Sequence, residues 1–159
     1  MATLKTPVSY YGGKQSLLRH ILPLIPKNNI TLYCEPFFGG GAVFFAKEPH
    51  EVEVINDLNS EVINFYRVLQ SNFAELQKEI KQTLHSRELH TDAYVIYTNP
   101  HLFDDVKRAW AFYVLCSQGF ASGIGKGWGY ARLDDACEKK VKNAKERFTD
   151  IYQKRIEKV

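Results

Sequence analysis

Residues 31–43, TLYCEPFFGGGAV, carry the strongest structural signal in this chain. The apolar positions around Leu32 and Cys34 predict a short buried strand, in which Cys34 would be a small core residue. The three consecutive glycines at 39–41 predict a turn, and residues 42–46 predict the beginning of a helix. A strand, a glycine turn and a helix in this order are typical of the opening of a nucleotide-binding α/β unit.

A second strand is expected at residues 52–55, and Asp57 follows it closely. In nucleotide-binding α/β units, an acidic residue after the second strand hydrogen-bonds a ribose, and glycines let the backbone approach the ligand. The same residues are also compatible with a glycine turn that only closes the connection between strand and helix. These glycines alone leave both interpretations open.

Composition and charge place this chain among ordinary globular proteins. It has 159 residues, 45% hydrophobic and 25% charged, which fits one folded domain and argues against disorder. The net charge of +3 is compatible with nucleic-acid binding without requiring it. Apolar runs are too short to span a membrane and residues 1–10 lack the features of a signal peptide, so we expect a cytoplasmic location and no membrane partner. The three cysteines have neither zinc-site nor disulfide spacing, so we expect no metal.

A second glycine-containing segment, YYGGKQ at residues 10–15, precedes the central strand. Such a loop could place an aromatic ring against a flat ligand and Lys14 near a carboxylate or phosphate. The alternative is a tight turn with a packed tyrosine and a solvated lysine. A helix is expected directly afterwards, over residues 16–25, with Pro23 ending or kinking it.

Four helices are expected after Asp57, over residues 58–70, 72–84, from 86 or 91 to 99, and 103–118. In the first, Leu58 is expected to face inward, whereas Glu61 and Asn64 are expected on the polar face. The histidines of this region, at 85, 90 and 101, have no partner in the sequence and are expected at the surface or at helix ends. The aromatic stripe that contains Trp110 is expected in the core.

Residues 119–131, GFASGIGKGWGYA, change character, because five glycines alternate with aromatic and basic residues. Exposed aromatic rings and basic side chains on a loop suit nucleic-acid contact, with charge on phosphates and rings on bases. The alternative is a surface loop whose Trp128 tucks into the core. A charged helix, packed on one side, is expected over residues 133–159.

Three segments in this order, YYGGK at 10–14, EPFFGGG at 35–41 and NDLN at 56–59, resemble the Dam-type family of adenine-specific DNA methyltransferases. The resemblance extends from residue 10 to about residue 152. It implies a partial Rossmann-like α/β fold that uses S-adenosyl-L-methionine and acts on DNA. Residues 1–70 would form the cofactor-binding part, and residues 71–159 a helical insertion resembling the target-recognition region.

The resemblance also implies roles for individual residues. The first segment would contact the methionine part of the cofactor, the second would wrap around it, and Asp57 would bind the ribose hydroxyls. The implied cofactor-binding residues are Tyr10, Gly12, Gly13, Lys14, Glu35, Pro36, Phe37, Gly39, Gly41 and Asp57. The implied DNA-binding residues are Lys126, Trp128, Tyr130 and Arg132.

The family's catalytic motif, Asp-Pro-Pro-Tyr, is absent from this sequence. In the family it holds the amino group of an adenine that has been flipped out of the duplex. The nearest match, Asn99-Pro100, falls in a predicted helical region. We therefore expect no catalytic residue and little or no transferase activity from this chain alone. Because uncovered sheet edges pair with other strands, we also expect self-association or pairing with a second chain.

Two other functions are compatible with parts of the sequence. A non-catalytic DNA-binding or interaction module derived from the same fold would bind DNA without needing the cofactor. A different nucleotide-dependent transferase or dehydrogenase is disfavoured, because the G-x-G-x-x-G spacing of dinucleotide-binding proteins is missing.

Overall fold

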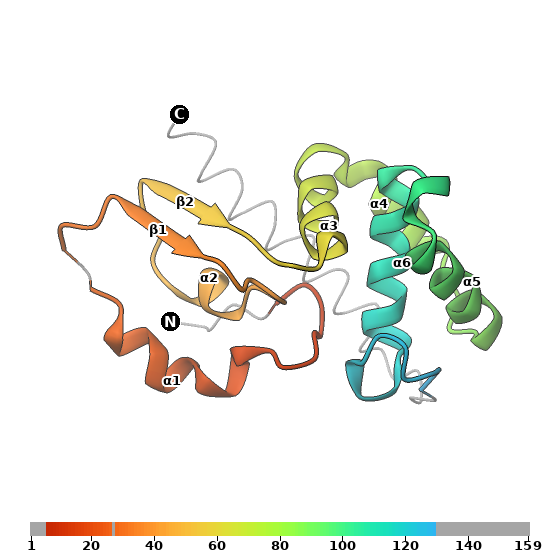
Figure 1. The fold of residues 1–159 in the computed structure, drawn as a ribbon, viewed down its shortest axis with the longest axis horizontal. Helices are drawn as coiled ribbons and strands as arrows, with labels where there is room; N and C mark the ends of the chain where they lie inside the picture. Colours follow the sequence, from red (N-terminus) through yellow and green to blue (C-terminus); the bar gives the residue numbers. More distant parts are fainter. Residues whose placement is uncertain (1–5, 27, 130–159) are drawn as a thin grey trace.

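The computed structural model describes residues 6–26 and 28–129, which form a small sheet beside a group of helices (Figure 1). Strands β1 (Leu32–Glu35) and β2 (Val52–Ile55) pair in parallel, and helix α2 (Ala42–Ala46) lies between them in the chain. Parallel strands need such a crossover connection. The helix predicted from residue 42 and the strand predicted at 52–55 are therefore confirmed, and the described chain is a mixed α/β structure.

The two faces of the sheet differ in burial. Leu32 pairs with Val52 and Cys34 with Val54, so these four side chains share one face, and all four are exposed. The opposite face carries Tyr33, which packs against the small cluster formed around α2. The predictions that β1 is buried and that Cys34 lies in the core are wrong, because the helices within residues 6–26 and 28–129 cover only the face opposite Cys34.

The helical segments follow the predicted order with shifted ends. Before β1, the predicted helix at 16–25 is a series of three short turns: η1 (Lys14–Leu17), α1 (Leu18–Ile21) and η2 (Leu22–Leu24), the last containing Pro23. After β2 come α3 (Ser60–Ser71), α4 (Phe73–Gln82), α5 (Arg87–Thr98), η3 (Pro100–Leu102), α6 (Asp105–Gln118) and η4 (Phe120–Ser122).

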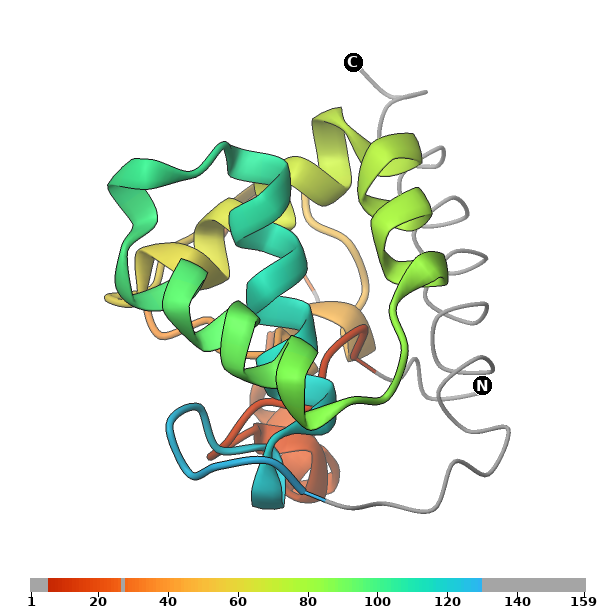
Figure 2. The same ribbon diagram turned by 90° about the vertical axis from the view of Figure 1, so that its right-hand side faces the viewer.

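Helix α6 lies at the centre of the helical group and packs on α3, α4 and α5 (Figure 2). It is apolar nearly all round, which is typical of a helix buried on every side. Phe112, Val114 and Leu115 are fully buried, and Trp110 is buried as the sequence predicts. Asp104 caps the helix, because its side chain accepts a hydrogen bond from the backbone N–H of Lys107.

Helix α3 buries its predicted apolar face, but three residues differ from the prediction. Leu58, expected inward, precedes the helix and is 96% exposed, because the helix begins after Asn59. Glu61 and Asn64, expected on the polar face, are buried against α6. Arg108 of α6 donates two hydrogen bonds to Glu61, at 2.6 and 3.2 Å, and Asn64 donates one to the backbone oxygen of Asp105. These partners on another helix explain why polar residues occupy the inner face.

Helix α5 begins after Ser86, one of the two predicted positions, and the Ser86 hydroxyl accepts a hydrogen bond from the backbone of Leu89. His90 is only 6% exposed, so its predicted surface position is wrong: α6 and the loop after it cover this side of α5. No helix within residues 6–26 and 28–129 is long and apolar enough to cross a membrane. The predictions for Tyr130, Arg132 and the helix at 133–159 lie outside the described residues.

Candidate functional site

The three segments singled out in the sequence lie side by side in the structure. Lys14 Nζ donates a hydrogen bond of 3.0 Å to the backbone oxygen of Phe37 and lies 3.6 Å from Oε1 of Glu35. The backbone N–H of Gly39 donates a hydrogen bond of 2.7 Å to Oδ2 of Asp57. Residues separated by more than forty positions therefore meet around the turn that follows β1.

Asp57 is held by two backbone groups. Besides Gly39, the backbone N–H of Asn59 donates to its Oδ1 at 2.9 Å. The side chain of Asn56 also donates to the backbone oxygen of Pro36, which ties the ends of the two strands together. Each carboxylate oxygen of Asp57 has a further lone pair, and the side chain is only partly buried. Asp57 is thus oriented to accept additional hydrogen bonds from a ligand.

Two glycines of the turn have conformations that other residues rarely adopt. Gly41 has a φ of 72°, and a Cβ built there would stand 2.7 Å from ring atoms of Phe38 and Phe45. Gly39 has a φ of 54°, and its Cβ would stand 3.3 Å from the ring of Tyr10. The turn therefore requires glycine at both positions, and the Tyr10 ring lies directly against it.

Glu35 is buried, at 6% exposure, and ends β1. Its Oε2 accepts a hydrogen bond from the hydroxyl of Tyr33 at 3.1 Å. Its Oε1 is buried and has no hydrogen-bond partner within the described residues, with Lys14 the cation beside it. Burial raises the pKa of the Glu35 carboxyl, although the Tyr33 hydroxyl and the Lys14 ammonium lower it. An acceptor that is buried yet unsatisfied marks a place where a ligand donor would be stabilised.

Asn59 and Tyr97 join this site to the helical group, and the sequence analysis did not assign a role to either. Asn59 Nδ2 donates to the hydroxyls of Tyr10, at 3.2 Å, and of Tyr97 on α5, at 3.0 Å. Its Oδ1 accepts from the backbone of Glu61 and caps α3. The capping position of Asn59 is readable from sequence. Its contact with Tyr97, 38 residues away, has no local signal.

The remaining residues of the first segment shape its turn. Gly12 has a φ of 74°, and the backbone N–H of Gly13 donates to the backbone oxygen of Tyr10 at 3.0 Å. Phe37, 77% exposed, points away from the core, unlike its neighbour Phe38. All ten residues implied for cofactor binding therefore lie in two turns and at the ends of the two strands, which adjoin each other.

The loop at 119–129 lies close to the first segment (Figure 2). Lys126 Nζ lies 4.2 Å from the ring centroid of Tyr11. Trp128 is half-buried: its ring lies 5.2 Å from that of His85, and the guanidinium of Arg87 lies 5.3 Å from its centroid. Trp128 thus packs on α5 and the residues before it. Within the described residues, no group of three or more potential metal ligands comes together.

Comparison with known proteins identifies the family to which the chain is similar. A family model for D12 class N6 adenine-specific DNA methyltransferases matches residues 10–127. The type II methyltransferase M1.LlaDCHI of Lactococcus lactis subsp. cremoris is 41% identical over 92 residues, which are 58% of this chain and 31% of the relative. The DNA N-6-adenine-methyltransferase of Escherichia phage P1 is 33% identical over 107 residues, 65% of this chain and 14% of the relative.

A third relative, the modification methylase StsI of Streptococcus sanguinis, is 31% identical over 110 residues, 64% of this chain and 16% of the relative. The chain therefore spans less than a third of the length of each of these relatives. The family model nevertheless covers all three segments of the site, from Tyr10 to Asn59. The resemblance inferred from the sequence is confirmed: this chain belongs to the D12 class of N6 adenine-specific DNA methyltransferases.

Proposed function

We propose that this chain supplies the S-adenosylmethionine-binding part, and a portion of the DNA-contacting surface, of an adenine-specific DNA methyltransferase. The observation that carries the proposal is the meeting of Lys14, Gly39 and Asp57 around one turn. A methyl donor with a ribose, an amino acid group and a sulfonium needs acceptors, a charged pair and close backbone approach in one place. The strand–helix–strand unit β1–α2–β2 would be the first part of a Rossmann-like methyltransferase fold.

Each end of the cofactor has a matching group in the proposed site. Asp57, with its two backbone donors in place, would accept the ribose hydroxyls. The unsatisfied oxygen of Glu35 would accept from the methionine amino group, and Lys14 would face the methionine carboxylate. Phe37 and Leu58, both highly exposed apolar side chains next to these groups in the chain, would cover the adenine. When bound, the cofactor supplies a methyl group on a positively charged sulfur.

A test of the cofactor site is the substitution Asp57→Ala. Losing a charge-assisted hydrogen bond costs about 1.5–3 kcal/mol, so we expect S-adenosylmethionine affinity to fall about 10- to 150-fold. Asp92→Ala, which removes an exposed carboxylate from α5, is the matched control and should leave the affinity unchanged. Thermal melting of both variants checks that the fold persists. Equal affinity of Asp57→Ala and wild type would remove the assignment.

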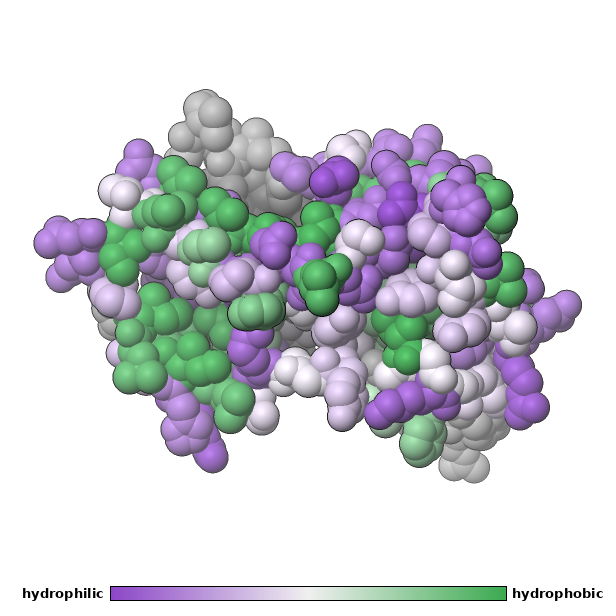
Figure 3. Space-filling view, in the orientation of Figure 1, coloured by the Kyte–Doolittle hydropathy of each residue, from purple (hydrophilic) through white to green (hydrophobic). Residues whose placement is uncertain are grey.

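We also propose that methyl transfer requires a polypeptide that carries Asp-Pro-Pro-Tyr, because this sequence has no such motif. The surface that this polypeptide would cover is the exposed apolar face of the sheet, formed by Leu32, Cys34, Val52 and Val54. Figure 3 shows hydrophobic residues gathered over the sheet and α1. Parallel sheets are normally covered on both faces, and helices with an apolar side provide the cover.

Two measurements test this second proposal. The purified chain alone, with radiolabelled cofactor and unmethylated DNA, should transfer no methyl group to adenine. Mixed with a polypeptide carrying the motif, it should become active, and Val54→Lys on the open face should weaken that activation. Transfer by the chain alone would contradict the proposal. A rise of mass with concentration in light scattering, without any partner, would show that a second copy covers this face instead.

The non-catalytic alternative has one observation in its favour, the loop at 119–129 with Lys126 exposed at the surface. If the chain were only a DNA-binding module, its DNA affinity would survive both Asp57→Ala and Lys14→Ala. Calorimetry with S-adenosylmethionine would then show no heat of binding. The methyl-donor proposal expects a measurable heat of binding.

A further inference from the structure

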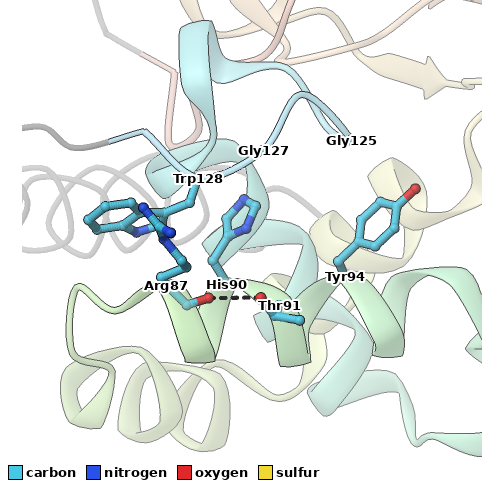
Figure 4. A pocket seen from close by; sticks show the side chains of 7 residues that line it. All are labelled: Arg87, His90, Thr91, Tyr94, Gly125, Gly127 and Trp128. Atoms are coloured by element: carbon cyan, nitrogen blue, oxygen red, sulfur yellow. Dashed lines mark hydrogen bonds between the residues drawn. The ribbon is translucent and has the colours of Figure 1, made fainter.

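A pocket of about 440 Å³ lies between α5 and the loop at 119–129, away from the turn after β1 (Figure 4). Helix α5 contributes Arg87, His90 and Tyr94, and the loop contributes Gly125, Gly127 and Trp128. The volume falls in the range of pockets that hold small organic ligands. Because two loop positions are glycines, backbone rather than side chains forms much of that wall.

We propose that this pocket binds one unpaired nucleotide, with its base against His90 and its phosphate at Arg87. The residues match that chemistry in three respects: a buried polar group at the bottom of the pocket, aromatic rings at its sides and a cation at its mouth. A base that is paired within a duplex is held in the stack and must be displaced from it before it can enter a pocket. Where the nucleotide is part of DNA, this inference rests on the proposed function.

His90 is the polar group at the base of the pocket. It is more than nine-tenths buried, points into the pocket, and its ring makes no hydrogen bond within the described residues (Figure 4). Burial lowers the pKa of His90, and the neighbouring His85 lowers it further, which favours the neutral form of the ring. A neutral imidazole has one donor and one acceptor, as does the edge of a nucleic-acid base.

Aromatic rings flank His90 on both sides. Figure 4 shows the histidine between Trp128 and Tyr94, with Arg87 lying against the Trp128 ring. Tyr94 is 43% exposed, so its ring face is accessible from outside. Stacking on aromatic side chains is how proteins hold single-stranded bases, and it tolerates different bases.

Arg87 supplies the charge at the mouth. Its side chain is exposed, and no carboxylate is among the described residues that line the pocket. A guanidinium with both a stacking partner and free donors binds phosphate well. The cation outside and the neutral imidazole inside orient a nucleotide with its phosphate outward.

The residues that line this pocket are not those around the turn after β1. The adenine that accepts the methyl group would be held by Asp-Pro-Pro-Tyr, which this sequence lacks. The nucleotide bound in this pocket would be one that is displaced from base pairing. In that role the pocket would help to hold the DNA open, through contacts that do not depend on one base type.

The experiment measures binding of four probes to the full chain by calorimetry: a single-stranded oligonucleotide, its duplex, thymidine monophosphate and thymidine. The single strand should bind more tightly than the duplex, and the monophosphate more tightly than the nucleoside. Binding of the monophosphate at the same affinity as the single strand would indicate free nucleotides as the source. Weaker monophosphate binding would indicate a DNA strand.

Variants then locate the binding. Tyr94→Ala, at an exposed position, should lower the affinity for the single strand about 5- to 150-fold. Arg87→Ala should lower the affinity for thymidine monophosphate and leave the affinity for thymidine unchanged. Arg67→Ala, an exposed arginine on α3, is the matched control and should change neither. Equal effects of Arg87→Ala and Arg67→Ala, no effect of Tyr94→Ala, or no binding of any probe would overturn the proposal.

The cofactor titration separates this proposal from the proposed function. S-adenosylmethionine affinity, measured in Tyr94→Ala, should equal that of wild type, because Tyr94 is not among the residues around Asp57. If wild type bound no cofactor but bound the single strand through Tyr94, the proposed function would fail and the pocket would stand. If wild type bound the cofactor but did not bind the single strand through Tyr94, only the pocket proposal would be overturned.

Discussion

Gly41→Ala should destabilise the protein strongly, because two costs combine at this position. The residue has a left-handed φ of 72°, which costs an alanine about 1–2 kcal/mol. The added methyl group would also stand 2.7 Å from ring atoms of Phe38 and Phe45. Both rings are buried, and Phe38 packs edge-on against Tyr66 with centroids 4.9 Å apart, so neither moves freely. Overpacking of this kind costs about 1–3 kcal/mol.

The expected total is about 2–5 kcal/mol, a large share of the 5–15 kcal/mol by which domains are usually stable. Gly12→Ala is the matched control, since Gly12 has a φ of 74° and no neighbour within 4 Å of the added Cβ. This substitution should lower stability only through the left-handed backbone conformation, by about 1–2 kcal/mol. Urea denaturation at 25 °C measures both. Equal losses in the two variants would refute the reasoning that the two rings close the turn.

Three further predictions concern buried groups. Because burial raises the pKa of the Glu35 carboxyl, the stability of the fold should fall as the pH rises from the ordinary glutamate pKa through the raised one. Thermal melting from pH 4 to 8 should show that Glu35→Gln flattens this fall and raises stability at neutral pH. An unchanged slope in the variant would contradict the prediction. Glu61→Ala leaves the partly buried Arg108 without its main partner and should cost about 3 kcal/mol in urea denaturation. Glu79→Ala, in the more exposed pair with Lys107, should cost under about 1 kcal/mol, and equal losses would contradict this prediction. A thiol reagent should label the exposed Cys34 in the folded chain but not the buried Cys116, because burial raises the pKa of the Cys116 thiol to about 12. Protection of Cys34 would mean that the open face of the sheet is covered.

Local sequence rules predicted the parts of the fold that depend on near neighbours. The turn of glycines before Ala42, the strand ending at Ile55 and the beginning of α5 after Ser86 each follow from residues within a few positions. The three site segments were also identifiable, since each combines glycine, aromatic and charged residues in a short span.

Contacts between distant elements explain the errors. Glu61 is buried because Arg108, 47 positions away, pairs with it across two helices. His90 is buried by α6 and the loop after it, which no pattern within α5 indicates. Cys34 is exposed because the described helices cover only the other face of the sheet, which is a property of neighbouring elements rather than of the strand. The boundary expected at residue 70, next to the end of α3, stays a prediction.

The measurement that tests the methyl-donor site most directly is a titration of the ¹⁵N-labelled chain with S-adenosylmethionine, followed by backbone amide shifts. The account predicts that Gly12, Gly39 and Asn59 shift together with one dissociation constant, since they border one site. The amide shifts of Gly125 and Gly127, which line the pocket by α5, should not change. Independent behaviour of the first three amides, or no shift among them at saturating cofactor, would contradict the claim that the segments form a single cofactor site.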